Sequence, residues 1–465
     1  MTVAVADDVQ PLSSYLAEAI ASPQTALPQQ AADAVRAAIA DCMGVLVAGA
    51  REPAVARMRD VVLRGGGGDE ARWLPDGRRC SARDAALING VAAHILDYDD
   101  VGLDGHPTAV LLPAILAEGE ALGCDFAAVL RAYVTGYETW AVLRATARVP
   151  LHGVGWHPSS VFGAVAAAAS CATLHQLDAE AAGHALGLAG GASGGLMANF
   201  GTLAKPLQTA RAAEAGLLAA RLAANGTTGN VAMFDCDGDF SRLFAGGASM
   251  RPIEAFGRGR WAILSDPIGF KAYPLCFAAH RLVDAALDLR ARGVPMEEVE
   301  RVTAYLGRIP SEVLHACAPG TPLEAKFSAE FAVASALLYG PVTLEHLDPK
   351  SLDDPTLRAL MQRVERQTTD AIGEEPPHAP ADRIVLHLRG GATVSSVEVR
   401  DAPGSRRRPM SRDQAEAKFV GNAAPSLGEG AATMWFNRLL ELKPGDPITA
   451  ALSPPIVPQS VGAAA

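Results

Sequence analysis

Most of the chain carries apolar residues at the spacing of amphipathic helices. In one N-terminal segment Ala32, Val35, Ile39, Met43 and Leu46 recur every three to four residues, which places them on one helix face. Many alanines and leucines, both strong helix formers, accompany this periodicity. The pattern predicts helices over 12–21, 29–48 and 84–96, a succession of helices from 106 to 226, and helices over 275–290, 413–419 and 431–442.

A second pattern, alternation of apolar and polar residues, appears only late in the chain. Such alternation is typical of strands with one buried face. Strands are predicted around the alternating positions Val302, Ala304, Leu306, then Ile384, Leu386, Leu388, and finally Val397 and Val399. We therefore predict a mainly α protein, with a large helical domain formed by 1–268 and 403–465 and a smaller α+β domain formed by 269–402.

Composition narrows the class of protein. The chain has 465 residues, of which 49% are hydrophobic and 5% aromatic, and a formal net charge of −11. Such an acidic chain is not expected to bind nucleic acid, and no charge-free apolar run reaches the roughly 18 residues of a membrane span. Residues 1–14 include Asp7 and Asp8 and no basic residue, so we expect no leader and a cytoplasmic protein. The seven cysteines form no C-x-x-C pair, which gives a zinc ribbon or iron–sulfur cluster no support.

Basic residues stand just ahead of prolines that are expected to open helices. Proline is favoured in a first helical turn, whereas a cation there costs about 0.3–1 kcal/mol because the helix N-terminus already carries partial positive charge. An anion bound between such ends would offset the repulsion. A pocket for a polycarboxylate or phosphate is therefore predicted at His106-Pro107, His157-Pro158, Lys205-Pro206 and Lys271-Ala272-Tyr273-Pro274.

The densest polar cluster follows the helix predicted over 84–96. His94 and Asp97 are three residues apart and are expected to meet at the helix end, and Asp99, Asp100 and His106 follow them. Imidazoles and carboxylates suit divalent metals. The spacing matches no defined metal motif, so we predict no metal site.

Helix-end chemistry adds two expectations. A helix N-terminus disfavours the cationic form of His157, which would keep its imidazole neutral and able to act as a base. Ser159 and Ser160 are expected to cap that helix. Cys276 lies at the predicted start of helix 275–290, where a thiol pKa can be depressed, although a buried structural cysteine is the simpler interpretation.

Short motifs occur in a fixed order along nearly the whole chain: His94-x-x-Asp97-Tyr98-Asp99-Asp100, Gly105-His106-Pro107, Gly136-Tyr137-Glu138, Gly155-Trp156-His157, Lys205 with Ala212-Ala213, Asn225-Gly226-Thr227-Thr228-Gly229, Lys271-x-Tyr273-Pro274-x-Cys276, Lys326-Phe327-Ser328 and Lys418-Phe419. Together they resemble the MmgE/PrpD family, which includes 2-methylcitrate dehydratase and cis-aconitate decarboxylase. The resemblance implies a large all-helical domain, a smaller α+β lid domain, an active site in the cleft between them, and a homodimer. It also implies proton transfer on small di- or tricarboxylates without metal or other cofactor.

The predicted site combines catalytic and substrate-binding members. The catalytic candidates are His106, His157, Lys205 and Asp97, and the substrate-binding candidates are Lys271, Asp100, Tyr273 and Cys276. We expect His157 or Lys205 to be the base and His106 the acid. Lys271 would anchor a carboxylate, and Asp97 would orient a neighbouring basic side chain.

Departures from the family pattern bear on the reaction. Val101 stands where the decarboxylase branch usually carries Thr, and Cys276 where it carries His. Gln208 and Ala210 replace a His and a Gly that many members carry after the lysine. We therefore predict a lyase that dehydrates a small hydroxy-polycarboxylate, in the manner of 2-methylcitrate dehydratase. The alternatives are an epimerase of an amino- or imino-dicarboxylate, a cis-aconitate-type decarboxylase, and a non-enzymatic carboxylate-binding protein.

Overall fold

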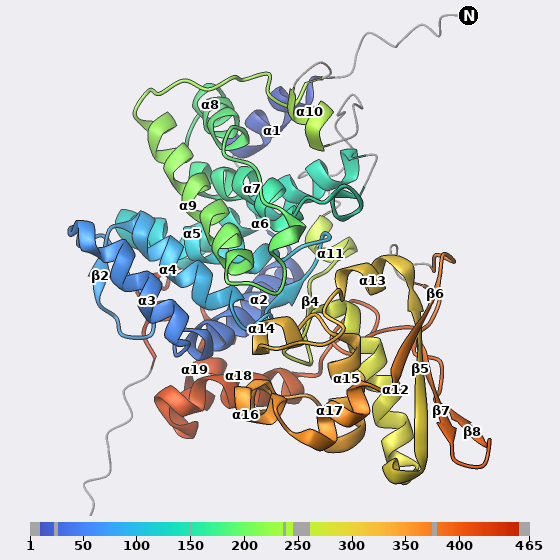
Figure 1. The fold of residues 1–465 in the computed structure, drawn as a ribbon. Coiled ribbons are helices and arrows are strands. Elements are labelled where there is room, and N and C mark those ends of the chain that lie inside the picture. The colour runs from blue at the N-terminus through green and yellow to red at the C-terminus, as the bar shows by residue number, and fades with distance from the viewer. Residues whose placement is uncertain are drawn as a thin grey trace, which may run out of the picture.

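A computed structural model gives the fold (Figure 1). It describes residues 10–22, 27–147, 150–235, 239–244, 261–373 and 379–454. Cys236 and residues 1–9, which are most of the 1–14 segment used for the leader prediction, lie outside these ranges. Within them, no helix combines the length and the apolar character needed to cross a membrane.

Helices make up most of the larger part of the molecule, as predicted. Their bounds in the N-terminal half are α1 Leu12–Ala21, α2 Gln29–Gly49, α3 Pro53–Val62, α4 Ala82–His94, α5 Pro107–Leu122, α6 Phe126–Thr146, α7 Pro158–Leu174, α8 Ala179–Gly190, α9 Ala204–Ala224, α10 Asp239–Phe244 and α11 Ala262–Ser265. The C-terminal segment adds α18 Arg412–Leu427, α19 Glu429–Glu441 and α20 Thr449–Leu452.

Small residues let these helices approach closely. A Cβ added at Gly216 of α9 would lie 2.5 Å from the Ala167 Cβ of α7, and one at Gly90 of α4 would lie 2.8 Å from the Ala210 Cβ of α9. Close-packed interiors leave no room for larger side chains there. Sequence rich in Ala and Gly therefore yields a tight bundle around α9.

The C-terminal segment returns to the helical part. Figure 1 shows α18 and α19, in red, beside the blue α2. A Cβ at Gly44 of α2 would lie 2.8 Å from the Phe419 ring of α18. The Lys418 ammonium also pairs with the Asp41 carboxylate of α2 at 2.6 Å.

The helical part is not all-helical. It contains a short antiparallel pair, β1 Ala71–Arg72 with β2 Arg79–Cys80. A second antiparallel pair joins β3 Asp100–Val101 to β4 Gly269–Phe270. This second pair links segments far apart in the sequence, and it positions the site described below.

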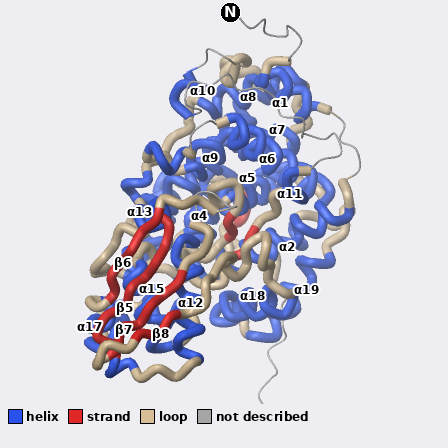
Figure 2. The backbone as a smooth tube through the Cα atoms, turned by 90° about the vertical axis from the view of Figure 1, so that its right-hand side faces the viewer, coloured by secondary structure: helices blue, strands red, loops and turns tan. Residues whose placement is uncertain are grey.

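The smaller part is built on a mixed sheet, with strand order β6-β5-β7-β8 and a parallel β5–β6 pair. Figures 1 and 2 place this sheet at the opposite end of the molecule from α1 and α8. Val302, Ala304 and Leu306 of β5 are buried as predicted, although Thr303 between them is buried as well. The elements are β5 Val299–Gly307, β6 Val364–Thr369, β7 Arg383–Leu388, β8 Thr393–Ser395, α12 His280–Ala291, α13 Arg308–Val313, α14 Pro322–Ala325, α15 Ala329–Tyr339, α16 Pro349–Leu352 and α17 Pro355–Met361.

Two predictions for this part need correction. Pro274 does not open a helix: the Cys276 N–H donates to the Lys326 carbonyl at 2.9 Å, which ties the segment to another part of the chain, and α12 begins only at His280. The last predicted strand is only partly formed: regular pairing in β8 ends at Ser395 and Val397 is 51% exposed, whereas Val399 is buried and pairs with Asp382.

Among the described residues, two separate hydrophobic clusters form the cores. One collects buried side chains from Leu12 to Ile263 together with those from Phe419 to Leu452, and the other collects those from Tyr273 to Val399. The clusters are consistent with the predicted division at 268 and 403. We retain that division as a proposal.

Buried His280 gives the smaller core a predicted pH dependence. Burial lowers the pKa of His280 to about 3, whereas an unfolded histidine has a pKa of about 6.5. Between these values the unfolded chain binds a proton that the folded chain does not, so stability falls as pH decreases. We expect His280→Gln to narrow the difference in melting temperature between pH 7 and pH 5. If the variant's melting temperature falls between pH 7 and pH 5 by as much as that of the wild type, His280 does not cause this pH dependence.

Candidate active site

The site begins at the loop that follows α4. Asp97 in this loop has a φ of 51°, a left-handed conformation that aspartate tolerates better than most residues. Three residues later the chain enters β3, whose partner β4 ends at Phe270. Lys271 follows directly, and its ammonium lies 2.8 Å from Asp97 Oδ1 and 3.0 Å from the Asp97 carbonyl oxygen. The β3–β4 pairing thus joins two charged residues that are distant in sequence.

Lys205 completes a buried charge cluster. It lies in the first turn of α9, and its ammonium contacts the same Asp97 oxygen at 2.6 Å. Burial opposes the charge of Asp97, but Lys205 and Lys271 hold the pKa of this carboxyl well below its usual value. Burial likewise opposes the charge of Lys271, yet Asp97 and Asp99 raise its pKa. Asp99 supplies a second negative charge, but Lys326 is a third cation close to Asp97, so the cluster keeps an excess positive charge that an anion can balance.

A tight turn after β3 positions His106. Gly102 and Gly105 exchange backbone hydrogen bonds of 3.0 and 2.9 Å, and Leu103 and Asp104 between them have φ values of 49° and 62°. His106 then occupies the N-cap of α5. Its Nδ1 faces the Asp100 carbonyl oxygen at 2.8 Å and Asp99 Oδ2 at 3.3 Å.

Both neighbours of His106 Nδ1 accept hydrogen bonds, so this nitrogen carries a proton. Burial lowers the pKa of His106, and Lys271 and Lys205 add to this effect against the opposing charge of Asp99. The imidazole is therefore neutral near pH 7, with a lone pair on Nε2.

His157 has the opposite tautomer. Gln208 donates from Nε2 to His157 Nδ1 at 2.8 Å. The orientation of this amide is fixed by Leu196, whose N–H donates to Gln208 Oε1 and whose carbonyl accepts from Gln208 Nε2, both at 3.2 Å. Because His157 Nδ1 accepts, its proton lies on Nε2. Burial, reinforced by Lys205, holds the pKa of His157 well below its usual value.

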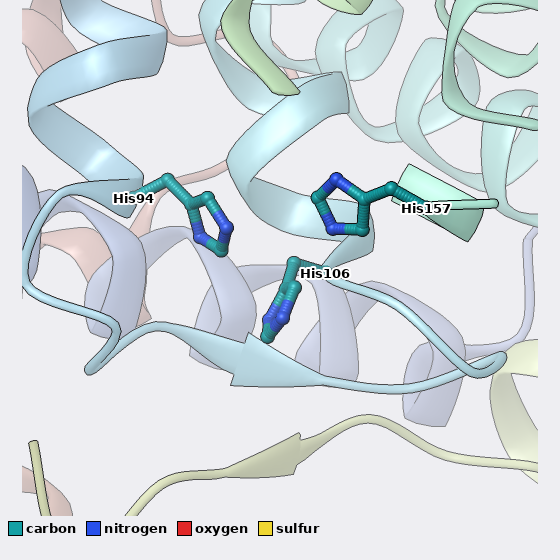
Figure 3. A group of neighbouring side chains, drawn as sticks. All are labelled: His94, His106 and His157. Carbon is teal, nitrogen blue, oxygen red and sulfur yellow. The ribbon is translucent and has the colours of Figure 1, made fainter. Parts of the chain in front are cut away.

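The imidazoles of His94, His106 and His157 lie together (Figure 3). The His94 and His106 ring centres are 4.4 Å apart, and His157 lies 6.3 and 6.4 Å from them. One nitrogen from each ring lies within 4.8 Å of the others, a spacing that could hold a metal ion. His94, Asp97 and Asp99 form a second such group. The predicted absence of a metal remains a prediction.

A cavity of about 430 Å³ lies beside this cluster, and two of its three histidines, His106 and His157, line the cavity. Asp97, His106, His157, Lys205, Lys271 and Cys276 all contribute to its wall, so six predicted site residues come together. Two others are not among the described residues that line it. The Tyr273 hydroxyl donates to Asp284 Oδ1 at 2.6 Å inside the smaller domain. Asp100 Oδ2 accepts from the Thr108 N–H and hydroxyl at 3.0 and 2.8 Å.

Three local predictions need correction. His94 meets Asp99 rather than Asp97, through a 2.9 Å contact at Nδ1. The Ser159 and Ser160 side chains do not cap α7: Ser159 Oγ accepts from the His106 N–H, and Ser160 Oγ contacts His157 Nδ1. Of the two interpretations of Cys276, the depressed thiol is wrong: burial raises its pKa to about 11, as expected for a buried cysteine, and only a short 3₁₀ turn begins there.

Sequence reasoning left three residues out of the site. Asp99 contacts both His94 and His106, and its place in the acidic run was the available signal. Gln208 was noted only as a departure from the family pattern, yet it sets the His157 tautomer. Lys326 donates to the Ile95 carbonyl at 3.0 Å, and burial lowers its pKa to about 8.

A mainly helical protein that gathers lysines and imidazoles around one cavity is suited to binding and reacting with an anion. Family models agree with this description: the MmgE/PrpD N-terminal domain matches residues 12–253 and the MmgE/PrpD C-terminal domain matches residues 273–441. The chain belongs to the MmgE/PrpD family.

Curated relatives are enzymes of the same family. Cis-aconitate decarboxylase of Homo sapiens is 29% identical over 367 residues, which cover 74% of this chain and 73% of that protein. The cis-aconitate decarboxylase of Mus musculus is 28% identical over 74% of this chain and 72% of that protein. That of Aspergillus terreus is 24% identical over 75% of this chain and 76% of that protein. These relatives are consistent with a lyase.

Proposed function

We propose that the protein is a lyase that dehydrates a small hydroxy-polycarboxylate by acid/base chemistry, without a cofactor. The observation that carries this proposal is the cluster of Lys205, Lys271, His106 and His157 around Asp97 in one cavity. Its excess positive charge suits substrate carboxylates, and its neutral imidazoles suit proton transfer near neutral pH.

The hydrogen-bond pattern favours His106 as the base. Its Nε2 lone pair would remove the proton from the carbon next to a carboxylate. Asp99, beside Nδ1–H, would stabilise the imidazolium that forms. His106 would then return this proton to the departing hydroxyl as the C–O bond breaks, which yields an alkene and water. One residue thus serves as base and as the predicted acid.

The other groups would stabilise the charge that develops on the substrate. Neutral His157 would donate a hydrogen bond from Nε2–H to the substrate. It would not act as the acid, because losing this proton would leave an unfavourable anionic imidazolate. The Lys205 and Lys271 ammonium groups would hold the carboxylate whose charge increases when the neighbouring C–H is broken. This assignment replaces our expectation that His157 or Lys205 is the base.

Decarboxylation of a cis-aconitate-type acid is the second candidate, favoured by the relatives in mammals and fungi. Val101 and Cys276, the positions where the decarboxylase branch carries Thr and His, both line the cavity. The site therefore offers fewer hydrogen-bonding groups at these positions, and for this reason we place dehydration first.

Incubation with 2-methylcitrate, citrate, cis-aconitate and an optically active amino-dicarboxylate separates the candidates when NMR, optical rotation and CO₂ release are measured. Alkene formation from a hydroxy acid, or hydration of cis-aconitate, supports the proposal. Release of itaconate and CO₂ from cis-aconitate without any hydration or dehydration would establish the decarboxylase instead. Racemisation of dicarboxylates alone would establish the epimerase.

We expect activity to survive exhaustive chelation. A divalent ion among the imidazoles would lie near Lys205, whose charge already disfavours protonation of His157, and the same repulsion would oppose a metal cation. Turnover after dialysis against EDTA, with metal content measured by mass spectrometry, checks this. Activity that disappears with the metal and returns when it is restored would refute the prediction.

The homodimer and the cytoplasmic location implied by the sequence remain proposals. Light scattering coupled to size-exclusion chromatography tests the first, since a mass close to one chain of 48.2 kDa would exclude a dimer.

A further inference from the structure

The wall contributed by the smaller domain differs chemically from the rest of the cavity. Among the described residues, the helical part supplies the imidazoles and Lys205, together with Arg144, Asp104 and Asp266. Past Cys276, the smaller domain supplies only apolar side chains: Phe277, Ala278, Ile309, Pro310, Val313 and Phe327. A citrate-type acid with no hydrocarbon substituent has nothing to place against such a wall.

This apolar wall begins directly beside the charge cluster. The Lys205 ammonium lies 5.2 Å from the centre of the Phe327 ring and 5.3 Å from that of Phe200. Phe277 follows Cys276 in sequence, and Cys276 lies close enough to Asp97 and Lys271 for their charges to act on its thiol. The 3₁₀ turn Phe277–Ala279 packs in turn against α13, which carries Ile309 and Val313.

From this continuity we propose that the substrate is an alkyl-substituted polycarboxylate, whose hydrocarbon chain of several carbons lies against Phe277, Ile309 and Val313. The proposal rests on the proposed function, because the charge cluster must hold the carboxylates of the same molecule. Carboxylates placed against this wall would lose hydration without a partner, whereas an alkyl chain gains about fourfold in affinity per buried methylene.

Two saturated acids without a hydroxyl test the subsite by binding alone. They are propane-1,2,3-tricarboxylate and heptane-1,2,3-tricarboxylate, which differ by one butyl chain, and calorimetry gives both dissociation constants. We expect the butyl acid to bind at least about tenfold more tightly. Val313→Asn should reduce this ratio several-fold, whereas Val397→Asn, at the exposed valine of the same domain, should preserve it. Thermal melts establish that both variants fold.

The outcomes separate this inference from the proposed function. Equal affinity for the two acids, or a ratio unchanged by both Val313→Asn and a second substitution, Ile309→Asn, would overturn the alkyl subsite and leave the proposed function standing. If neither acid binds, the proposed function fails, and the alkyl subsite with it.

Discussion

Replacing Asp97 by Asn should be among the most destabilising single changes in this protein. Asp97 is the buried carboxylate that Lys205 and Lys271 share, and its loss leaves two buried ammonium groups without the one carboxylate that both contact. Removing one partner of a buried ion pair costs about 3–5 kcal/mol. Asparagine tolerates the left-handed backbone at this position, so the effect should come from charge. Urea unfolding of the variant and the wild type measures it.

The matched variants are Lys205→Met and Lys271→Met. Each leaves Asp97 paired with the remaining lysine, so we expect a much smaller loss of stability, or none. Asp60→Asn, at an exposed carboxylate paired with Arg59, should change the free energy of unfolding by less than about 1 kcal/mol. If either lysine variant is as unstable as Asp97→Asn, the cluster does not carry an excess positive charge.

Replacing His106 by Asn should reduce kcat by about 10²–10⁴-fold, the range expected for loss of a general base. Asparagine can occupy a helix N-cap and can still donate to the Asp100 carbonyl, so the fold should remain. Because burial lowers the pKa of His106, wild-type activity should persist to mildly acidic pH and fall only when Nε2 becomes protonated.

Asp99→Asn provides the complementary measurement. Asp99 acts through His106, so its loss should lower the pKa of the imidazole and move the acidic limb of the kcat profile to lower pH. A purely structural role for Asp99 would leave the profile in place. If His106→Asn retains most of the activity while Lys205→Met abolishes it, the base is Lys205, as the sequence also allowed.

Much of the fold was predictable because helical periodicity is local. The bounds predicted for the first helix agree with α1, and those of the second differ from α2 by one residue. Alternation identified β5 and β7. The start of α12 was not predictable from local patterns. The segment after Pro274 is held by a hydrogen bond from the Cys276 N–H to the Lys326 carbonyl, a contact between residues far apart in the sequence.

The sequence identified most of the residues in the site, but it did not predict how they contact one another. Proline and charge at helix starts identified His106, His157 and Lys205, which do lie at such starts. Lys271 does not lie at a helix start; it lines the same cavity because β3 pairs with β4 directly before it. Tyr273 was predicted to bind substrate because it lies two positions from Lys271. It does not line the cavity, since a nearby residue in an extended segment need not face the same cavity. The histidine tautomers depend on tertiary partners such as Gln208, so sequence alone could not assign them.

Exchange of carbon-bound hydrogen with deuterated water tests the central claim most directly, because proton removal next to a carboxylate is common to dehydration and epimerisation. The protein is incubated in D₂O with citrate, 2-methylcitrate and propane-1,2,3-tricarboxylate, and deuterium incorporation is followed by NMR. We predict incorporation next to a carboxylate in at least one acid, and its loss in His106→Asn. Tight calorimetric binding of these acids without any exchange would contradict the account and identify a carboxylate-binding protein instead.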